Sequence, residues 1–407
     1  MESNILQVLD PRDLGHRLQE ARKARGWTQQ QAAAQLGVAR TTLTAIEKGE
    51  RRIQPDELLR LASSYGRSVG ELLRRGGPIE AFAVQFRATL APGAPESPAS
   101  DADQAEFQRL CEDYLALEEL RRAPLPRKYP PTYEINGTAP EAAAEDAAGA
   151  ERNRLGLGEG PILSLRELLE SDVGLRIFYL DLPSRVAAMF AYTERLGGCI
   201  AVNRRHPEER RRQSVAHEYG HFLARRYQPG MVLLGRYQRQ PDHERFAEAF
   251  ARCFLMPAAG LSRRYHELHR SREGRITPAD LCRLAHFYFT SVEALTRRLE
   301  ELRLVRSGTW ERLHDSGFKV REAQALLQLP RQRERDQPLP TRYMYLAAEA
   351  FERDELSEGQ FARFLRVDRV EARRLAEELS AGTVLSDEGT VGTLPLDLGE
   401  PLPQRDA

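Results

Sequence analysis

The string RQSVAHEYGHF, at residues 212–222, decides the fold of the central part of this chain, because it carries a His-Glu-x-x-His motif within a helical pattern that runs over 208–226. Residues four apart lie on one face of a helix, so His217 and His221 can bind the same Zn²⁺ ion. Glu218 lies beside them, where a carboxylate can act as the catalytic base toward a water molecule. The spacing therefore predicts a zinc site of the catalytic type.

A third metal ligand must come from elsewhere in the chain. Glu244 opens the next helical pattern, 23 residues after His221, and Asp242 and His243 are close competitors for the same role. Glu248 follows one turn later and could hold a ligand histidine through its other ring nitrogen, in the second shell. A water molecule is expected in the fourth position, which distinguishes catalytic from structural zinc.

The motif string, with ERFAEAFA at 244–251 and FLMP at 254–257, resembles the ImmA/IrrE metallopeptidase family over about residues 151–305. The resemblance implies a zincin-like domain that depends on zinc, with Glu244 as the third ligand. For some members it also implies cleavage of a repressor protein under stress or during induction of a mobile element. The chain departs from the family at Glu248, where Asn or Asp is usual, and at Phe246, where a second Glu often stands.

Three short apolar segments precede the motif and predict β-strands, at 175–180, 186–192 and 199–203. Proline and glycine separate them, as turns between strands require. A helix is expected before them, at 163–170. We therefore expect a metallopeptidase domain over 151–262, with a small sheet beside the motif helix.

The N-terminal segment, residues 11–77, is basic, with thirteen Lys or Arg against seven Asp or Glu. Thr28 and Gln31 fit a capping box that starts the second of its helices. Gly37 supplies a tight turn, because glycine adopts a left-handed backbone at little cost. A third helix follows over 38–47, so the segment is expected to be an all-α helix-turn-helix domain.

The third helix of this segment exposes Arg40, Thr41 and Thr42 at its start, where an arginine can donate two hydrogen bonds to guanine in the major groove. Residues 27–49 resemble the phage-repressor (XRE) helix-turn-helix family. That resemblance implies that Gln29 contacts a phosphate and that the other three residues face bases of a double-stranded operator. One such module makes few contacts, so we expect a homodimer on two half-sites.

Residues 78–150 differ in composition from the basic segment. The part over 78–120 has two basic and nine acidic side chains. The Pro/Ala/Ser-rich stretch over 91–104 predicts a flexible linker, and 141–149 predicts a break before the next domain. A short strand is expected before the linker and a connecting helix after it; their apolar residues are Phe82, Val84 and Phe86, then Phe107, Leu110, Cys111, Tyr114, Leu117 and Leu120.

The rest of the chain is expected to be helical up to a flexible tail, with a helical extension at 263–310, a C-terminal helical region at 311–380 and the tail at 381–407. Two stretches, 276–305 and 356–379, each fit either a further helix-turn-helix-like pair or ordinary helical packing. In the second stretch Ser357 is the expected N-cap, and the inward residues are Phe361, Phe364 and Leu365.

The composition of the chain limits the classes of protein to which it can belong. Lys plus Arg and Asp plus Glu both number 60, which argues against a wholly basic nucleic-acid coat. The four cysteines lie far apart, and neither a signal peptide nor a membrane-spanning apolar run is recognisable, so a cytoplasmic location is expected. His206, Tyr227 and His243 are candidates for stabilising an oxyanion, and the sequence does not choose among them.

These observations predict a mainly α protein with a small α+β zincin-like domain and an N-terminal all-α helix-turn-helix domain. Two functions fit this organisation. In the first, a DNA-binding transcriptional regulator has a zinc metallopeptidase domain that cleaves a repressor or partner protein. In the second, the regulator's zinc domain is a non-catalytic sensor or docking module.

Overall fold

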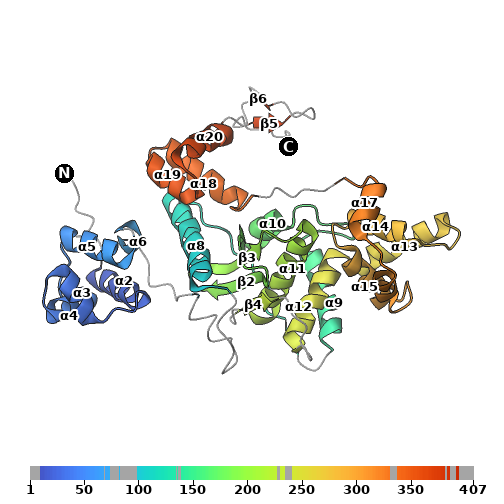
Figure 1. Cartoon of the computed structure of the whole chain (residues 1–407), viewed down its shortest axis with the longest axis horizontal. Coiled ribbons are helices and arrows are strands. Elements are labelled where there is room, and N and C mark those ends of the chain that lie inside the picture. Colours follow the sequence, from blue (N-terminus) through green and yellow to red (C-terminus); the bar gives the residue numbers. More distant parts are fainter. Residues whose placement is uncertain are drawn as a thin grey trace, which may run out of the picture. The chain divides into compact units, whose positions relative to one another are not determined.

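The computed structural model describes residues 10–67, 69–73, 82, 99–133, 135, 139–226, 230–233, 241–330, 337–380, 383–385 and 391–393. The chain divides into two compact units, Met1–Glu80 and Ala81–Ala407 (Figure 1). Within the described ranges, no helix is both long and apolar enough to cross a membrane.

The N-terminal unit consists, in its described part, of α2 (Pro11–Ala24), α3 (Gln29–Leu36), α4 (Arg40–Glu47), α5 (Pro55–Tyr65) and α6 (Val69–Leu73). The predicted capping box is present, because Thr28 accepts from the Gln31 backbone and the Gln31 side chain accepts from the Thr28 backbone. Gly37 has the predicted left-handed conformation, with φ 70°. The third helix begins at Arg40, two residues later than predicted, and Ala39 provides no side-chain cap.

A four-stranded sheet, in the order β1-β3-β2-β4, lies at the centre of the second unit. The strands are β1 (Arg176–Leu180), β2 (Val186–Thr193), β3 (Gly197–Asn203) and β4 (Gly230–Leu233). β1 and β3 are parallel, whereas β2 is antiparallel to both β3 and β4. The three predicted strands are therefore confirmed. The sequence analysis missed β4, whose four residues are too few to show an alternating pattern.

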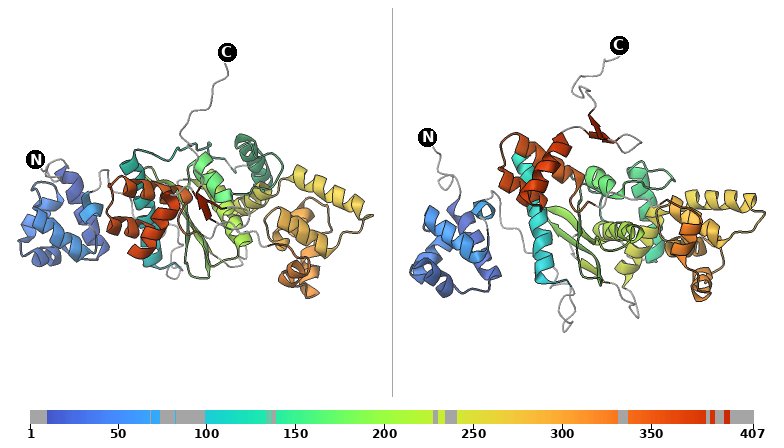
Figure 2. Two further views of the ribbon diagram at one scale, coloured as in Figure 1. Left: turned by 90° about the horizontal axis from the view of Figure 1, so that it is seen from above. Right: turned by 45° about the horizontal axis from the view of Figure 1, so that its top comes forward.

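Helices cover the sheet in successive layers (Figure 2). The motif helix α11 (Glu208–Arg225) packs on β2 and β3, α12 (Asp242–Leu255) packs on α11, and α9 (Pro140–Arg154) packs on α12. The expected helix before β1 is present as α10 (Leu165–Leu168), followed by a π-helical turn over Leu169–Val173. The structure confirms a mainly α fold with a small sheet, and an all-α domain that precedes it in the sequence.

The predicted break at 141–149 is wrong, because these residues form the body of α9. Ala144, Ala147, Ala148 and Glu151 are buried at the spacing of one helix face, and the three alanines belong to the main hydrophobic core. Alanine is a strong helix former, so an Ala-rich segment is compatible with a helix as well as with a linker. The core of the second unit thus includes residues before 151.

The predicted linker at 91–104 is also partly wrong. Helix α8 (Asp101–Arg121) begins inside it, and Ser100 with Asp103 forms a capping box at its start. The apolar residues predicted for the connecting helix lie on α8. Of the predicted strand, Phe82 has helical backbone and packs on Phe107, with ring centroids 5.0 Å apart, whereas Val84 and Phe86 lie outside the described residues.

The remaining helices are α13 (Ala258–Ser271), α14 (Pro278–Phe287), α15 (Val292–Glu301), α16 (Thr309–Asp315), α17 (Val320–Leu326), α18 (Thr341–Glu352), α19 (Glu358–Leu365) and α20 (Arg369–Ser380). α14 and α15 turn their apolar faces into the main core, and α18 packs on α8. The tail expected to be flexible contains a short antiparallel hairpin of β5 (Thr383–Leu385) and β6 (Val391–Thr393). The rest of that tail lies outside the described residues.

Candidate metal centre

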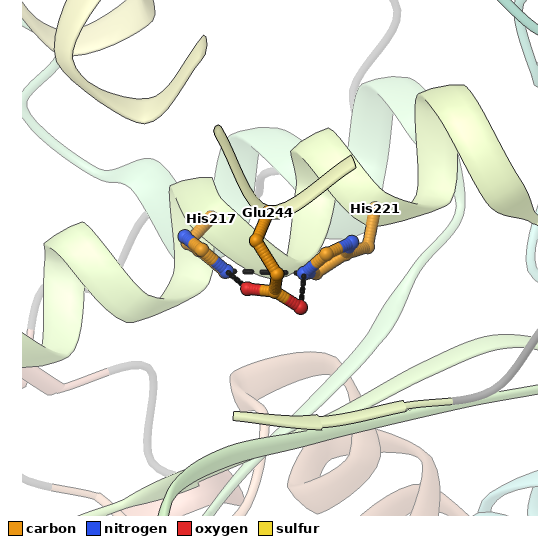
Figure 3. Close-up of side chains that lie close together, drawn as sticks. All are labelled: His217, His221 and Glu244. Carbon is orange, nitrogen blue, oxygen red and sulfur yellow. Dashed lines mark hydrogen bonds and ion pairs between the residues drawn. The ribbon is translucent and has the colours of Figure 1, made fainter. Parts of the chain in front are cut away.

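The structure brings three of the predicted ligand side chains together (Figure 3). The Nε2 atoms of His217 and His221 on α11 are 3.0 Å apart. Each lies 3.4 Å from a carboxylate oxygen of Glu244, which projects from the first turn of α12. Ligands about 2.1 Å from a tetrahedral zinc ion are about 3.4 Å from one another. The two 3.4 Å distances run to different oxygens of Glu244, so the spacings are close to those between the ligands of such an ion but do not define one face of its tetrahedron.

Glycine in the motif allows the two helices that carry these residues to approach closely. A Cβ atom at Gly220 would lie 3.0 Å from the Ala247 Cα and 3.2 Å from the Phe250 ring. Any larger residue would push α12 away from α11. Because Glu244 is carried by α12, that displacement would also move its carboxylate from the two imidazoles.

The electrostatics of the cluster favour the protonation states that a metal ion needs. Burial lowers the pKa of His221 to about 4, so its ring is neutral at pH 7. Burial opposes ionisation of Glu244, but hydrogen bonds from His217 and His221 outweigh it and hold the pKa of that carboxyl below its ordinary value. Neutral imidazole and ionised carboxylate are the forms that coordinate zinc.

Glu218 gives an independent test of whether this site suits a metal ion and water. Its side chain is fully buried, and neither carboxylate oxygen has a hydrogen-bond partner among the described residues. Burial, and secondarily the charge of Glu244, raises its pKa well above the ordinary value. Burial of a carboxylate without hydrogen-bond partners lowers the free energy of unfolding. A bound metal ion with its water would supply the missing partner, so the residues present fit that group.

The competitors for the third ligand position lie differently. Asp242 is largely exposed and accepts from Arg245 at 3.2 Å. His243 is half-buried and its Nε2 lies 3.7 Å from a Glu244 oxygen, at the edge of the cluster. Among the oxyanion candidates, His206 contacts the Ser184 carbonyl at 3.3 Å, and Tyr227 lies outside the described residues.

Glu248, predicted to support a ligand histidine, contacts an arginine of its own helix. Its carboxylate accepts from Arg252 at 2.9 Å, one turn further along α12. Arg252 in turn pairs with Glu301 on α15 at 2.8 Å. Phe246, the other departure from the family pattern, is fully buried in the main core. The second-shell contact from Glu248 to a histidine stays a prediction.

In the helix-turn-helix unit, the start of α4 is open to solvent. Arg40 and Thr41 are exposed and Thr42 is half-buried. The Gln29 side chain instead connects helices, because its amide donates to Glu47 at 2.9 Å and accepts from the Thr44 hydroxyl at 3.3 Å. The phosphate contact expected for Gln29 stays a prediction.

Sequence analysis missed the partner of Glu47. Glu47 is buried and accepts from Arg22 on α2 through both oxygens, at 2.6 and 3.1 Å. The two residues are 25 positions apart, and no local pattern links them. The only available signal was an acidic residue on the helix face that also carries Leu43 and Ile46, which points toward the core.

Fold and geometry together define a helix-turn-helix domain, a class of DNA-binding domain, joined to a domain with a possible His/Glu metal-binding cluster. Comparison with family models gives the particular families. Residues 18–72 match the helix-turn-helix model, and residues 170–300 match the IrrE N-terminal-like domain of peptidase family M78. The chain thus contains an XRE-type helix-turn-helix domain and an IrrE N-terminal-like domain, and both resemblances found in the sequence are confirmed.

Two solved structures show a distant similarity. One is Bacillus thuringiensis PlcR in complex with the peptide PapR7 and DNA, with 12% identity, 91% of this chain and 99% of that chain covered, and a TM-score of 0.16. The other is ComR from Streptococcus suis, with 12% identity, coverage of 91% and 94%, and a TM-score of 0.16. No curated protein matches the chain.

Proposed function

We propose that this protein is a DNA-binding transcriptional regulator whose second unit is a zinc-dependent peptidase that cleaves a repressor or other partner protein. The observation that carries the peptidase assignment is Glu218, a fully buried carboxylate with no hydrogen-bond partner in the described part of the chain, next to the grouped His217, His221 and Glu244. A sensor or docking module would need the ligands but not this residue, so Glu218 favours catalysis over a purely structural site.

Zinc bound to the three ligands would supply Lewis-acid activation of water and of the scissile carbonyl. The chain's own residues would do the rest. Glu218 would accept a proton from the attacking water and transfer it to the leaving amine, as a general base and then a general acid. Burial raises the pKa of this carboxyl, which favours its acceptance of a proton. His217, His221 and Glu244 would remain fixed by α11 and α12.

The first unit would direct the protein to an operator. Arg40 and Thr41 are exposed at the start of α4, where they can reach base edges in the major groove. A single unit of this size makes few contacts, so we propose that a homodimer binds two half-sites.

Glu218→Gln tests the peptidase proposal, because it removes the proton acceptor and retains shape and metal ligands. Purified wild type and variant are incubated with a partner protein captured from cells, and the products are analysed by mass spectrometry. The matched control is Glu267→Gln, the same change at an exposed position of α13. We expect cleavage by wild type and the control, bound zinc in all three proteins, and a loss of at least 100-fold in rate for Glu218→Gln. Cleavage that persists in Glu218→Gln would exclude this mechanism.

A further inference from the structure

Helices α19 and α20, near the C-terminal end of the described chain, repeat the local structure of α3 and α4. Both first helices have eight residues. Both start with a capping box in which a hydroxyl residue pairs with a glutamine three positions later, Thr28 with Gln31 and Ser357 with Gln360. If Ser357 is aligned with Thr28, every following residue through the next helix start corresponds without a gap.

The turns between the two pairs of helices also correspond. Gly37 and Arg366 occupy equivalent positions and are both left-handed, with φ 70° and 59°. The next residue closes the same hydrogen bond in each case, from the Val38 amide to the Ala33 carbonyl at 3.1 Å and from the Val367 amide to the Ala362 carbonyl at 3.1 Å. A non-glycine residue in this conformation is uncommon, so the turn is specified by the surrounding structure.

Burial follows the same alignment, and both second helices begin with an arginine. Four buried residues of the first motif, Ala32, Ala33, Leu36 and Leu43, correspond to the buried Phe361, Ala362, Leu365 and Ala372, whereas the buried Ile46 corresponds to the half-buried Leu375. Arg40 and Arg369 are the first residues of α4 and α20. The other candidate pair differs: α14 has ten residues, and its left-handed residue, Phe289, lies beyond the helix cap.

Charge is distributed along α20 against the helix dipole. Its first half has three arginines and one glutamate, and its second half has Glu377 and Glu378 without a basic residue. A helix is stabilised by acidic residues near its N-terminus and basic residues near its C-terminus, by about 0.3–1 kcal/mol each. The reversed order therefore costs stability at the helix ends, which the ion pairs of Arg373 and Arg374 with neighbouring glutamates offset in part. In a helix-turn-helix, it places positive charge on the end that approaches DNA.

Contacts from neighbouring helices hold the turn before α20, and α18, α19 and α20 lie together at one end of α8 (Figure 1). Arg366, in this turn, pairs with Glu106 and Asp113 of α8 at 2.8 and 3.0 Å. The Tyr343 hydroxyl of α18 donates to the Phe364 carbonyl at 2.9 Å. The solvent-facing side chains at the start of α20 are Arg369, Val370, Arg373 and Arg374, and we call them the α20 face.

We propose that α19 and α20 form a second helix-turn-helix that contacts duplex DNA through the α20 face. Arg373 pairs with Glu358, and Arg374 with Glu371 and Glu378, in ion pairs whose arginines are more than half exposed. Such pairs contribute about 0–1 kcal/mol, so the guanidinium groups can turn to phosphates at little cost. Val370, 76% exposed, corresponds to Thr41 and can contact a thymine methyl group. This inference does not depend on peptidase activity.

The salt dependence of DNA binding by the full chain tests the proposal. Each phosphate contact adds about 0.9 to the slope of log K against log salt concentration. We expect the double variant Arg369→Gln with Arg373→Gln to reduce the magnitude of this negative slope by about 2 on a random-sequence 30-bp duplex. The control, Arg270→Gln with Arg275→Gln, removes the same charge from exposed positions of the second unit and is expected to change nothing. Equal slopes for the two variants, or an unchanged slope for the first, would overturn the proposal.

Photo-crosslinking gives a second readout that does not remove charge. A photoreactive amino acid replaces Val370 in one full-length protein and Tyr345, an exposed residue of α18, in another. We expect a covalent adduct with labelled duplex from position 370 and none from position 345. Adducts at equal yield from both positions, or an adduct of position 370 with a second protein copy in place of DNA, would show that the α20 face does not contact DNA.

Discussion

Tyr219, inside the His-Glu-x-x-His motif, donates its hydroxyl to the carboxylate of Glu151 on α9. Glu151 is fully buried and also accepts from Arg154 at 2.7 Å and from Tyr133 at 3.2 Å. The ligand histidines occupy one face of α11, whereas Tyr219 points away from that face, because residues two apart on a helix lie nearly opposite each other. The motif thus anchors its own helix to α9.

Tyr219→Phe should lower the free energy of unfolding by about 1–3 kcal/mol, because it leaves the buried Glu151 with one hydrogen bond fewer. Zinc content should stay unchanged, since the ligands are on the other face. Urea denaturation and metal analysis measure the two quantities. Tyr345→Phe, at an exposed tyrosine, is the control and should have no effect. A stability equal to wild type would show that the hydroxyl is not a structural link.

His217→Ala should abolish stoichiometric zinc binding, because two remaining ligands cannot hold the ion in a tetrahedral site. Wild type should contain one zinc ion per chain by mass spectrometry, and zinc should raise its Tm, since a ligand that binds only the folded state stabilises it. His266→Ala removes an exposed histidine on α13 and serves as control. Equal zinc content in all three proteins would place the ion elsewhere.

Arg40→Ala should weaken specific binding to the operator by about 1–3 kcal/mol and relax the preference at one base position. A gel-shift titration with operator and random duplexes measures both effects. Arg60→Ala on α5, which removes an exposed arginine from the same unit, should leave the ratio of the two affinities unchanged. If Arg40→Ala reduces both affinities equally, Arg40 contacts phosphate and not a base.

Local sequence signals predicted a large part of this structure, since they act over a few residues. Thr28, Gln31 and Gly37 specify a cap and a turn, and His217 and His221 share a helix face through spacing alone. The α9 helix was missed because its Ala-rich composition suits both a linker and a helix, although its buried alanines recur with helical spacing. Ser100 was likewise hidden within the Pro- and Ser-rich stretch before α8.

Long-range pairs could not be predicted, because nothing in the sequence fixes which distant elements meet. The Tyr219–Glu151 hydrogen bond and the Arg22–Glu47 pair depend on how helices pack. The carboxylate of Glu218 could not be predicted either: the motif identifies the residue, but only the packed structure shows that its oxygens have no hydrogen-bond partner among the residues described. A helix-turn-helix-like pair at 356–379 was one of two alternatives left open by the sequence, and its match to α3 and α4 became visible only with the left-handed Arg366 at the position of Gly37.

Glu57→Gln should reduce the acid sensitivity of the N-terminal unit. Burial opposes ionisation of Glu57, but hydrogen bonds from Arg51 and the Gln54 backbone hold its pKa below the ordinary value. A carboxyl with a lowered pKa in the folded state stabilises above its unfolded pKa of about 4.3, and this contribution is lost as pH falls through the folded value. The variant should lose about 1–2 kcal/mol at pH 7, and its difference from wild type should shrink as the pH falls below the unfolded pKa of the carboxyl.

Trp27 fluorescence reports unfolding of this unit in a Trp310→Phe background, because the chain has two tryptophans and Trp310 lies in the second unit. Asp56→Asn, at a neighbouring exposed carboxyl, provides the control. An identical pH dependence for Glu57→Gln and wild type would contradict the assignment of the lowered pKa to a stabilising contact.

Glu47→Ala should be the most damaging change in the N-terminal unit. Arg22 and Glu47 have side chains that are 8% and 0% exposed, and the hydrogen bond to Glu47 raises the pKa of Arg22 despite its burial. Removal of one partner from a buried pair leaves an uncompensated charge and costs about 3–5 kcal/mol. Gln29 loses a partner as well. We therefore expect the unit to unfold at a lower urea concentration and DNA binding to be lost, with zinc content unaffected.

Trp27 fluorescence in the Trp310→Phe background measures this transition, with Glu50→Ala as the control, because Glu50 is acidic, exposed and three residues away. Glu47→Gln separates charge from shape: its amide oxygen can still accept from Arg22, so it should cost less than Glu47→Ala while leaving the guanidinium without a counter-charge. If Glu47→Ala and Glu50→Ala unfold at the same urea concentration, the buried pair does not stabilise this unit.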